Sequence, residues 1–583
     1  MKIELARSSG FCMGVRRAVE LALEAVHTRP GPIYSYGPLI HNPQAMKLLS
    51  DKGLIALDSG IEGLAGIRGG TVIIRAHGIP PGEWRALEAK GLDLIDATCP
   101  RVIRVQAIIR RHAGRGYTTV IWGNPTHPEV IGLLGQAEDN GFVIQGPDDV
   151  AGLPEAERVI LVAQTTQNHQ AFDDVIAAVR RRWPEVEVFD TICGATQRRQ
   201  DEVRRLARAV EAMVVVGGHS SGNTKRLAAA AEAEGVKTVH VETEAELDPD
   251  WLAGAETVGV TAGASTPNWM IRRVTREIER LARKGDTSFQ SLAHRVLRFL
   301  LLSNLYAAFG AGMLCLSGAL LQGIKPQPVF FGVAFFYIHA MHILNNFLDK
   351  EASTFSEPDR ASFLDTYKTG LLGSGVVSAL VSLALSLTIG WKALALLTLM
   401  SVGGLLYSVP LAPKSWPRFA RLRRLKDIPS SKTIMLSGGW ALCLSLVPAL
   451  SAEGLTGWPT LLVGLAIFLL VFIRSGLGDI MEIQGDRIVG RETIPIIIGE
   501  QKTQRLLNVA AGLLVVVLVG GWLSGLLTSL ALLLLACAAY TAFYLFLFRR
   551  RLMMGGTFFE ALVDAVFILA GLLSWFWAGV RGG

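Results

Sequence analysis

Long apolar runs fill the second half of this chain, and they restrict its fold more than any other feature. From about Val296 onward, runs such as LLNVAAGLLVVVLVGGWL and LTSLALLLLACAAYTAFYLFLF are long enough to cross a bilayer as helices. Before about Asp286, charges are scattered throughout, as in a soluble α/β protein. With 583 residues the chain is too long for one core. We therefore predict two domains, over residues 1–282 and 296–583, joined by a linker over 283–295.

About nine spans are expected in the second half, which predicts an all-α membrane domain. The expected spans cover 298–322, 328–348, 370–390, 392–411, 433–452, 458–478, 505–524, 526–547 and 557–579.

The charge of the connecting segments predicts the orientation of these spans. KSWPRFARLRRLKD and FRRRL are basic, whereas SAEGLTGWP carries no Lys or Arg, so the positive-inside rule places the basic loops in the cytoplasm. Much of the net charge of +7 lies in these loops, which argues against a nucleic-acid partner. The start, MKIELARSSGFC, has no apolar signal sequence. We expect a multi-pass protein of the cell (inner/plasma) membrane with its first half in the cytoplasm.

Three of the six cysteines, Cys12, Cys99 and Cys193, lie in the first half in matching settings. KIELARSSGFC, GLDLIDATC and EVEVFDTIC each lead from a strand-like stretch into the cysteine, and a helix-compatible segment follows. Such strand-to-helix turns are where α/β folds place ligands. We infer three similar α/β units that bring the cysteines to one centre. Three thiolates there suggest an iron–sulfur cluster with one iron lacking a protein thiolate, while a zinc site or three unrelated buried cysteines are the alternatives.

A second group of residues is rich in histidine. His41, His77 and His127 each follow a β-like stretch and neighbour Gly or Pro, which is typical of binding loops at strand ends. A lone histidine there is usually structural, but three in matching settings favour a shared site. Glu129, two residues after His127, would be a natural proton carrier. A zinc hydrolase that uses the same four residues is an alternative.

Two small polar runs, GGHSSGNTKRL and TAGASTP, also follow β-like stretches. Such turns present backbone N–H groups and hydroxyls to an oxyanion. Either run alone could be a plain turn. Together with the histidines they predict a diphosphate pocket.

The ordered motifs GFCMGVRRAVE, GPLIHNP, RAHGIPP, DATCP, THPEV, AQTTQ, TICGATQRRQ, GGHSSGNTKRL and TAGASTP resemble 4-hydroxy-3-methylbut-2-enyl diphosphate reductase over residues 1–280. The resemblance implies a trefoil of three α/β units around a [4Fe–4S] cluster held by Cys12, Cys99 and Cys193. It also implies that the fourth iron takes the substrate's hydroxyl oxygen. Two protons, with two electrons from a ferredoxin- or flavodoxin-like donor, would expel water. The products would be isopentenyl and dimethylallyl diphosphate, at the last step of the non-mevalonate isoprenoid pathway.

The same resemblance implies roles for individual residues of the first half. Glu129 would deliver protons and would be hydrogen-bonded near Thr165 or Thr166. Gly222 stands where some members carry a second serine, and its backbone N–H can replace that donor. The expected substrate-binding residues are His41, His77, His127, Thr165, Ser221, Gly222, Asn223 and Ser265.

Residues 290–580 resemble the UbiA-type intramembrane prenyltransferases, with two acidic segments on the cytoplasmic side and LLYSVPLAPK before a basic loop. The resemblance implies a prenyl diphosphate substrate, Mg²⁺ that bridges it to carboxylates, and a lipid or aromatic acceptor. The second motif is intact at Asp479, Glu482 and Asp486, whose spacing puts three carboxylates on one helix face.

The first acidic motif departs from the family pattern N-D-x-x-D-x-x-x-D. Its positions are Asn345, Asn346, Asp349 and Ser353, so that two of three expected carboxylates are missing. Glu351 and Asp359 are the nearby acidic residues that would have to compensate. Two hypotheses follow for the membrane half: a prenyltransferase that makes the protein bifunctional, or a non-catalytic anchor or lipid-binding module.

Overall fold

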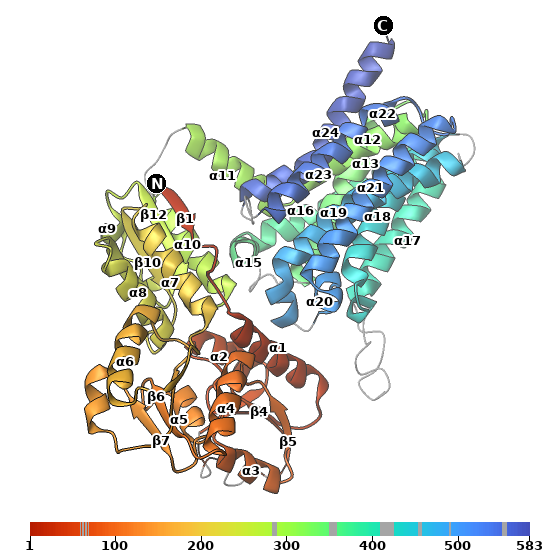
Figure 1. Ribbon diagram of the computed structural model, residues 1–583. Helices are drawn as coiled ribbons and strands as arrows, with labels where there is room; N and C mark the ends of the chain where they lie inside the picture. Colours follow the sequence, from red (N-terminus) through yellow and green to blue (C-terminus); the bar gives the residue numbers. More distant parts are fainter. Residues whose placement is uncertain are drawn as a thin grey trace. The chain divides into compact units, whose positions relative to one another are not determined.

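The computed structural model describes residues 1–58, 60, 63, 67, 69–282, 289–348, 358–408, 425–452, 457–488, 491–550 and 557–582. The chain divides into two compact units, Met1–Gly285 and Asp286–Gly583. The first unit mixes helices and strands, and the second is helical throughout its described residues (Figure 1).

The strands of the first unit form three parallel sheets of four strands each. Their middle strands are almost continuously apolar and buried, as expected where helices cover both faces of a parallel sheet. The sheet orders are β5 (Asp93–Asp96), β4 (Thr71–Ile74), β2 (Ile33–Tyr36), β3 (Leu54–Leu57); β9 (Glu187–Phe189), β8 (Val159–Ala163), β6 (Thr118–Trp122), β7 (Gly141–Ile144); and β1 (Lys2–Leu5), β12 (Thr257–Ala262), β10 (Ala212–Val216), β11 (Lys237–Val241).

Each sheet has a cysteine just beyond the same edge strand. β1 leads to Cys12, β5 to Cys99 and β9 to Cys193. The third sheet is completed by the start of the chain, because β1 pairs with β12 in parallel. The prediction of three similar α/β units is therefore confirmed.

A helix begins directly after each of the three cysteines, also as predicted. These helices are α1 (Met13–Thr28), α4 (Pro100–Ala113) and α7 (Gly194–Ala207). Pro100 at the first position of α4 suits a helix start, since its missing N–H would have no helical partner there.

The second unit contains seven helices that are long and apolar enough to cross a membrane, within the described residues, or eight if one bent pair counts as a span. This supports a multi-pass membrane domain. The seven spans are Pro328–Leu348, Lys368–Ile389, Ser431–Ser451, Trp458–Ile483, Glu500–Leu523, Leu530–Arg549 and Phe558–Val580.

Within the described residues the count of nine spans is not confirmed, and the difference lies at two places. Leu292–Leu302 and Leu305–Leu321 meet at a bend of 72°, where Asn304 adopts a left-handed conformation with φ 60°. The helix Trp391–Tyr407 is shorter than the seven spans.

The expected linker divides into two parts. Residues 283–288 lie outside the described residues, and 289–295 belong to α11 (Phe289–Leu302).

Candidate active site and membrane cavity

The three cysteines occupy equivalent positions in their units. Each is the N-cap of its helix, where the positive end of the helix dipole favours a thiolate. Each backbone N–H donates to the carbonyl two residues beyond the neighbouring strand: Cys12 to Ala264 at 3.0 Å, Cys99 to Ala76 at 2.9 Å, and Cys193 to Thr165 at 2.8 Å. The same backbone hydrogen bond thus places each cysteine at the equivalent position beyond the carboxyl end of its sheet.

Cys99 lies directly against α1, the helix that follows Cys12. A Cβ on Gly14 of α1 would overlap Cys99 Sγ and stand 2.9 Å from Cys99 Cβ. Arg17 of α1 also donates to the carbonyls of Thr98 at 3.0 Å and Asp96 at 2.9 Å. Glycine at position 14 therefore permits an approach that any side chain would block.

The surroundings of the thiols combine burial with a positive charge. Burial raises the pKa of Cys99, and its neighbours Cys12 and Cys193 raise it further. The buried guanidinium of Arg199 lies near Cys12 and Cys193, and donates to the carbonyls of Ala262 at 3.2 Å and Gly10 at 2.6 Å. A negative group bound to these thiolates would face this fixed cation.

The three predicted histidines form one cluster. The ring centroid of His41 lies 4.5 Å from that of His77 and 5.4 Å from that of His127. Each follows a middle strand, namely β2, β4 and β6, so that two units contribute. Among the residues that the structure describes, the ligand atoms of these three histidines all lie within 4.8 Å of one another, close enough to hold one metal ion. The three cysteine sulfurs do not meet this distance.

Three buried side-chain nitrogens of the predicted site residues have no hydrogen-bond partner. They are His41 Nε2, His77 Nδ1 and Asn223 Nδ2. Buried polar atoms of a native protein are normally satisfied, so a converging set of unpaired ones indicates a ligand site. Burial lowers the pKa of all three histidines, that of His127 to about 4, which keeps them neutral near pH 7 in the free protein.

Two arginines belong to this site and were not predicted. Arg75 is buried and Arg226 partly buried, and their charges help to lower the pKa of His127. Arg75 directly follows β4, two residues before His77, and Arg226 follows Asn223 by about one helical turn. A charged residue at the end of a buried strand was the available sequence signal for Arg75.

Glu129 is buried beside Thr165, and this resolves which of the two threonines contacts it. Thr165 donates its backbone N–H to Glu129 Oε1 at 2.7 Å and its hydroxyl to Oε2 at 2.9 Å. Thr166 instead accepts a hydrogen bond from Arg226 Nη1 at 3.2 Å. Burial raises the pKa of Glu129, while the bonds from Thr165 and the charge of Arg226 act in the opposite direction.

The predicted residues that follow β10 and β12, namely Ser221, Gly222 and Ser265, belong to the same region as the histidine cluster. Ser265 donates its hydroxyl to the carbonyl of His41 at 2.9 Å. Ser221 caps α8 (Gly222–Glu232) by accepting from the backbone N–H of Thr224 at 3.3 Å. A Cβ on Gly222 would lie 3.5 Å from Arg226 Nη1, which is an ordinary contact. The structure thus brings the predicted residues of all three units to one region.

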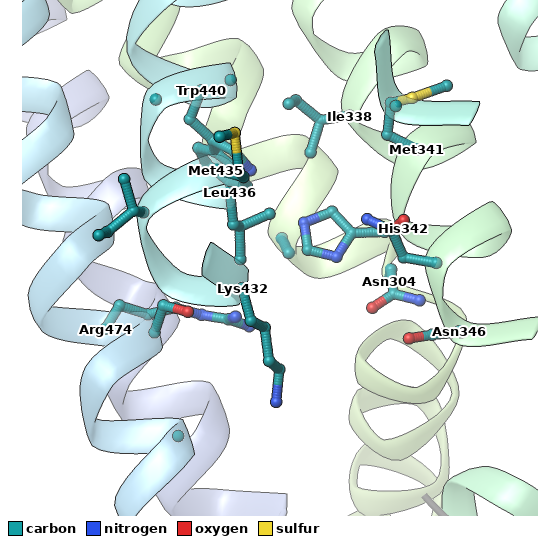
Figure 2. A pocket seen from close by; sticks show the side chains of 18 of the residues that line it. Asn304, Ile338, Met341, His342, Asn346, Lys432, Met435, Leu436, Trp440 and Arg474 are labelled. Carbon is teal, nitrogen blue, oxygen red and sulfur yellow. The ribbon is translucent and has the colours of Figure 1, made fainter. Parts of the chain in front are cut away.

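The second unit encloses a cavity of about 690 Å³. Figure 2 shows apolar side chains, including Ile338, Met341 and Trp440, toward one end, and Lys432 and Arg474 toward the other. Such a cavity can hold a ligand with an apolar chain and a charged head.

The first acidic motif is described only in part. Asn345 and Asn346, near the end of α13 (Pro328–Leu348), line the cavity, and Asn346 Nδ2 is buried without a hydrogen-bond partner. Asp349, together with Ser353, lies outside the described residues.

The second acidic motif lies on α19 (Trp458–Ile488), and its three carboxylates converge on Lys432. The ammonium Nζ lies 2.8 Å from Glu482 Oε2, 3.3 Å from Asp479 Oδ1 and 3.8 Å from Asp486 Oδ2. This lysine was not predicted, because in the sequence it only marks the start of an apolar run.

Two further ion pairs line the cavity, and neither was predicted. Arg474 holds Asp564 with two bonds, Nε to Oδ1 at 2.7 Å and Nη2 to Oδ2 at 3.2 Å. Arg360 donates to Asn304 at 3.2 Å and lies 3.5 Å from Glu560. The charged wall of the cavity is therefore largely paired internally.

Known families match both halves of the chain. Residues 3–279 match the LytB protein family, and residues 305–559 match the UbiA prenyltransferase family. The two matches fall on the two compact units.

Individual relatives cover the first half almost completely. The chain is 43% identical over 284 residues to the 4-hydroxy-3-methylbut-2-enyl diphosphate reductase of Geobacter sulfurreducens, over 49% of this chain and 99% of that protein. It is 46% identical to the corresponding protein of Nitratidesulfovibrio vulgaris, over 48% of this chain and 100% of that protein. The second half is similar to a UbiA homolog from Archaeoglobus fulgidus at 15% identity and a TM-score of 0.36, over 48% of this chain and 97% of that one.

Proposed function

The chain belongs to the family of 4-hydroxy-3-methylbut-2-enyl diphosphate reductases and carries a UbiA-family domain in its second half, and we propose that its first half reductively removes the hydroxyl group of that diphosphate. Two electrons and two protons would convert the substrate into water and isopentenyl or dimethylallyl diphosphate. The protein is thus an oxidoreductase of isoprenoid biosynthesis.

Cys12, Cys99 and Cys193 fit a [4Fe–4S] cluster as its protein ligands. Three free thiols at helix N-termini, spread more widely than a single-ion site, match the donor set, and the missing side chain of Gly14 leaves Cys99 Sγ accessible. When bound, the cluster would supply the electrons and a Lewis-acidic iron without a protein thiolate. A ferredoxin- or flavodoxin-like protein is the proposed electron donor.

The histidine cluster would hold the diphosphate. His41 Nε2, His77 Nδ1 and Asn223 Nδ2 supply unpaired donors, and Arg75 and Arg226 supply fixed positive charge nearby. Ser221, Ser265, Gly222 and His127 would complete the pocket. Fixing the charged end of a small substrate in this way aligns its carbon end with the reacting centre.

Glu129 would deliver the protons. Its raised pKa favours the protonated form, and the two hydrogen bonds from Thr165 fix the direction of the carboxyl group. The observation that carries the proposal is this pairing of a buried, oriented acid with unpaired donors from several units around three equivalent cysteines.

A turnover assay tests the proposal. The anaerobically purified full chain, supplied with the hydroxylated diphosphate and reduced viologen, should release both products. Glu129→Gln should lower the rate about 100-fold or more, as expected for loss of a general acid. Glu185→Gln, at an exposed position, is the matched control and should turn over normally. Normal turnover by Glu129→Gln would remove the proton-delivery role.

For the second half we propose transfer of a prenyl group from a prenyl diphosphate to a lipid or aromatic acceptor. The cavity, with its apolar and charged ends, supports this. Mg²⁺ held by Asn345, Asp349, Asp479, Glu482 and Asp486 stays a prediction from the sequence. Transfer by the full chain in detergent that falls in Asp479→Asn would support the proposal.

The alternative is that the second half anchors the reductase or binds a prenyl lipid without catalysis. The departures at Asn346 and Ser353 favour it. If no transfer occurs with any acceptor, while Asn346→Asp combined with Ser353→Asp creates activity, the anchoring role is supported. In both cases we propose residues 1–282 and 296–583 as the domains, with the reductase on the cytoplasmic side of the cell membrane.

A further inference from the structure

A positive charge is buried beside two of the three cysteines and contacts no carboxylate. Arg199 on α7 is only 5% exposed. Among the residues that the structure describes, no ion pair includes its guanidinium. The two acids that follow it on the same helix pair with other arginines, Asp201 with Arg204 at 3.5 Å and Glu202 with Arg205 at 3.6 Å. The charge of Arg199 is therefore not neutralised by a neighbouring acid.

The hydrogen bonds of Arg199 engage its N–H groups but do not compensate its charge. Nη2 donates to the carbonyl of Gly10 at 2.6 Å, and Nη1 donates to that of Ala262, the last residue of β12, at 3.2 Å. Since Gly10 precedes Cys12 by two residues, these bonds join the helix that follows Cys193 to the turn before Cys12. A buried charge that contacts only neutral carbonyls is costly unless a negative group lies nearby.

The negative groups that act most strongly on this charge are the cysteine sulfurs. Burial lowers the pKa of Arg199, whereas the thiolates of Cys12 and Cys193 raise it. Glu202 acts in the same direction as the thiolates, but less strongly. A [4Fe–4S] core held by three thiolates carries a net negative charge, and one-electron reduction makes it more negative. Net charge and the polarity of the surroundings set the reduction potential of such a group.

We propose that Arg199 is a positioning residue that also raises the reduction potential of the cluster, because its buried charge favours the more negative, reduced form. The inference rests on the proposed cluster at Cys12, Cys99 and Cys193. Reduction takes one electron from the proposed ferredoxin- or flavodoxin-like donor, and Arg199 keeps its proton. The effect is strong because the low dielectric constant around a buried guanidinium leaves its field largely unscreened.

Potentiometric titration of the anaerobically purified full chain in detergent, followed by the electron paramagnetic resonance signal of the reduced cluster, tests the charge. Arg199→Gln should lower the equilibrium constant for one-electron reduction about tenfold or more, which is a midpoint potential lower by about 59 mV or more. Arg199→Lys keeps the positive charge and should change this constant less than about threefold. Arg180→Gln, at an exposed arginine of α6 (His169–Arg182), is the matched control and should leave the midpoint unchanged, since solvent screens its charge.

The midpoint potential separates the charge of Arg199 from a purely structural role. A substitution that only loosens the turn before Cys12 would lower the iron and sulfide content without shifting the midpoint of the clusters that remain. An unshifted midpoint in Arg199→Gln, or equal shifts in Arg199→Gln and Arg199→Lys, would overturn the inference. If Arg199→Gln holds no cluster, Arg199→Lys decides. A cluster with a midpoint close to that of the wild type then supports the inference, and no cluster in either variant overturns it.

Failure of the proposed function gives a different result. If the wild-type chain holds no iron–sulfur cluster, the assignment of the three cysteines is wrong, and the inference on Arg199 is wrong with it. A wild-type cluster together with an unshifted midpoint in Arg199→Gln removes the inference alone and leaves the proposed reductase intact.

Discussion

The two halves of this protein differ in how many of their buried charges are held in ion pairs. In the α/β half, His41 Nε2, His77 Nδ1 and Asn223 Nδ2 are buried without partners. In the helical half, Lys432 and Arg474 form ion pairs with the buried acids Asp479 and Asp564, although Asp479 Oδ1 and Asn346 Nδ2 have no hydrogen-bond partner. Unpaired nitrogens suit an anion, whereas a ligand that approaches an ion pair must compete with the partner that the chain supplies.

The largest expected effect is at Gly14. Gly14→Ala should abolish the cluster, because the added Cβ would overlap Cys99 Sγ and displace it from the common centre. Iron and acid-labile sulfide per chain after anaerobic purification measure the loss. Gly82→Ala, where an added Cβ meets nothing within 4 Å, is the matched control and should keep both. A full cluster in Gly14→Ala would show that Cys99 is not a ligand.

One substitution in each half tests whether a paired group contributes more to stability than an unpaired one. Asp564→Asn should lower the free energy of unfolding of the helical half by about 3 kcal/mol, since it leaves the buried Arg474 without its counter-charge. Asn223→Ala removes an unpaired donor and should cost less than about 1 kcal/mol. Scanning calorimetry of the full chain in detergent measures both. Equal losses of stability would remove the distinction between the two sites.

Thr165 allows the acid–base chemistry to be examined without removing Glu129. Thr165→Val deletes the hydroxyl that donates to Glu129 Oε2, and since that bond lowers the pKa of Glu129, its loss should raise the pKa further. Turnover needs the protonated acid, so its decline at high pH should move to higher pH. We expect the rate below this limb to fall about tenfold, because the acid is less well oriented. Thr165→Ser should restore the profile, and an unshifted limb would argue against Glu129 as the donor.

The neutral histidines predict that anion binding takes up protons. Their pKa values are lowered in the free protein, that of His127 to about 4, and a bound diphosphate should raise them. Between the free and bound pKa values, affinity should therefore increase as pH falls, by about threefold per unit for inorganic pyrophosphate. Calorimetry in buffers of different ionisation enthalpy measures the uptake, after correction for protonation of the anion. No uptake would mean that the histidines stay neutral in the complex.

The smallest expected effect is at Gly222. Gly222→Ser should be accommodated, because its Cβ would make only an ordinary contact at 3.5 Å with Arg226. The KM should change less than about twofold, since the added hydroxyl supplements a backbone N–H already present. A large rise in KM would show that the site needs the smaller residue.

Local sequence patterns predicted the elements of the α/β half and the residues that end them. The strand, cysteine and helix order recurs three times, and each element is short enough for local periodicity to define it. Arg75 and Arg226 were missed, because their importance depends on loops from different units meeting at the histidines. The pairing of β1 with β12 was not foreseen either, since it joins the two ends of the first unit.

The helical half was predicted less completely, because hydropathy gives the apolar runs but not the breaks in them. The bend at Asn304 and the short helix Trp391–Tyr407 account for the difference from nine spans. Lys432 was not predicted, although it lies among three carboxylates from a different helix. Contacts of this kind are set by helix packing, which a single sequence does not reveal.

The account depends most on three cysteines from three equivalent units holding one cluster. The direct measurement is the iron and acid-labile sulfide content of the anaerobically purified full chain and of Cys12→Ser, Cys99→Ser and Cys193→Ser. The account predicts about four of each per wild-type chain and a marked loss in every variant. Zinc without iron or sulfide in the wild-type chain, or a cluster that survives all three substitutions, would contradict it.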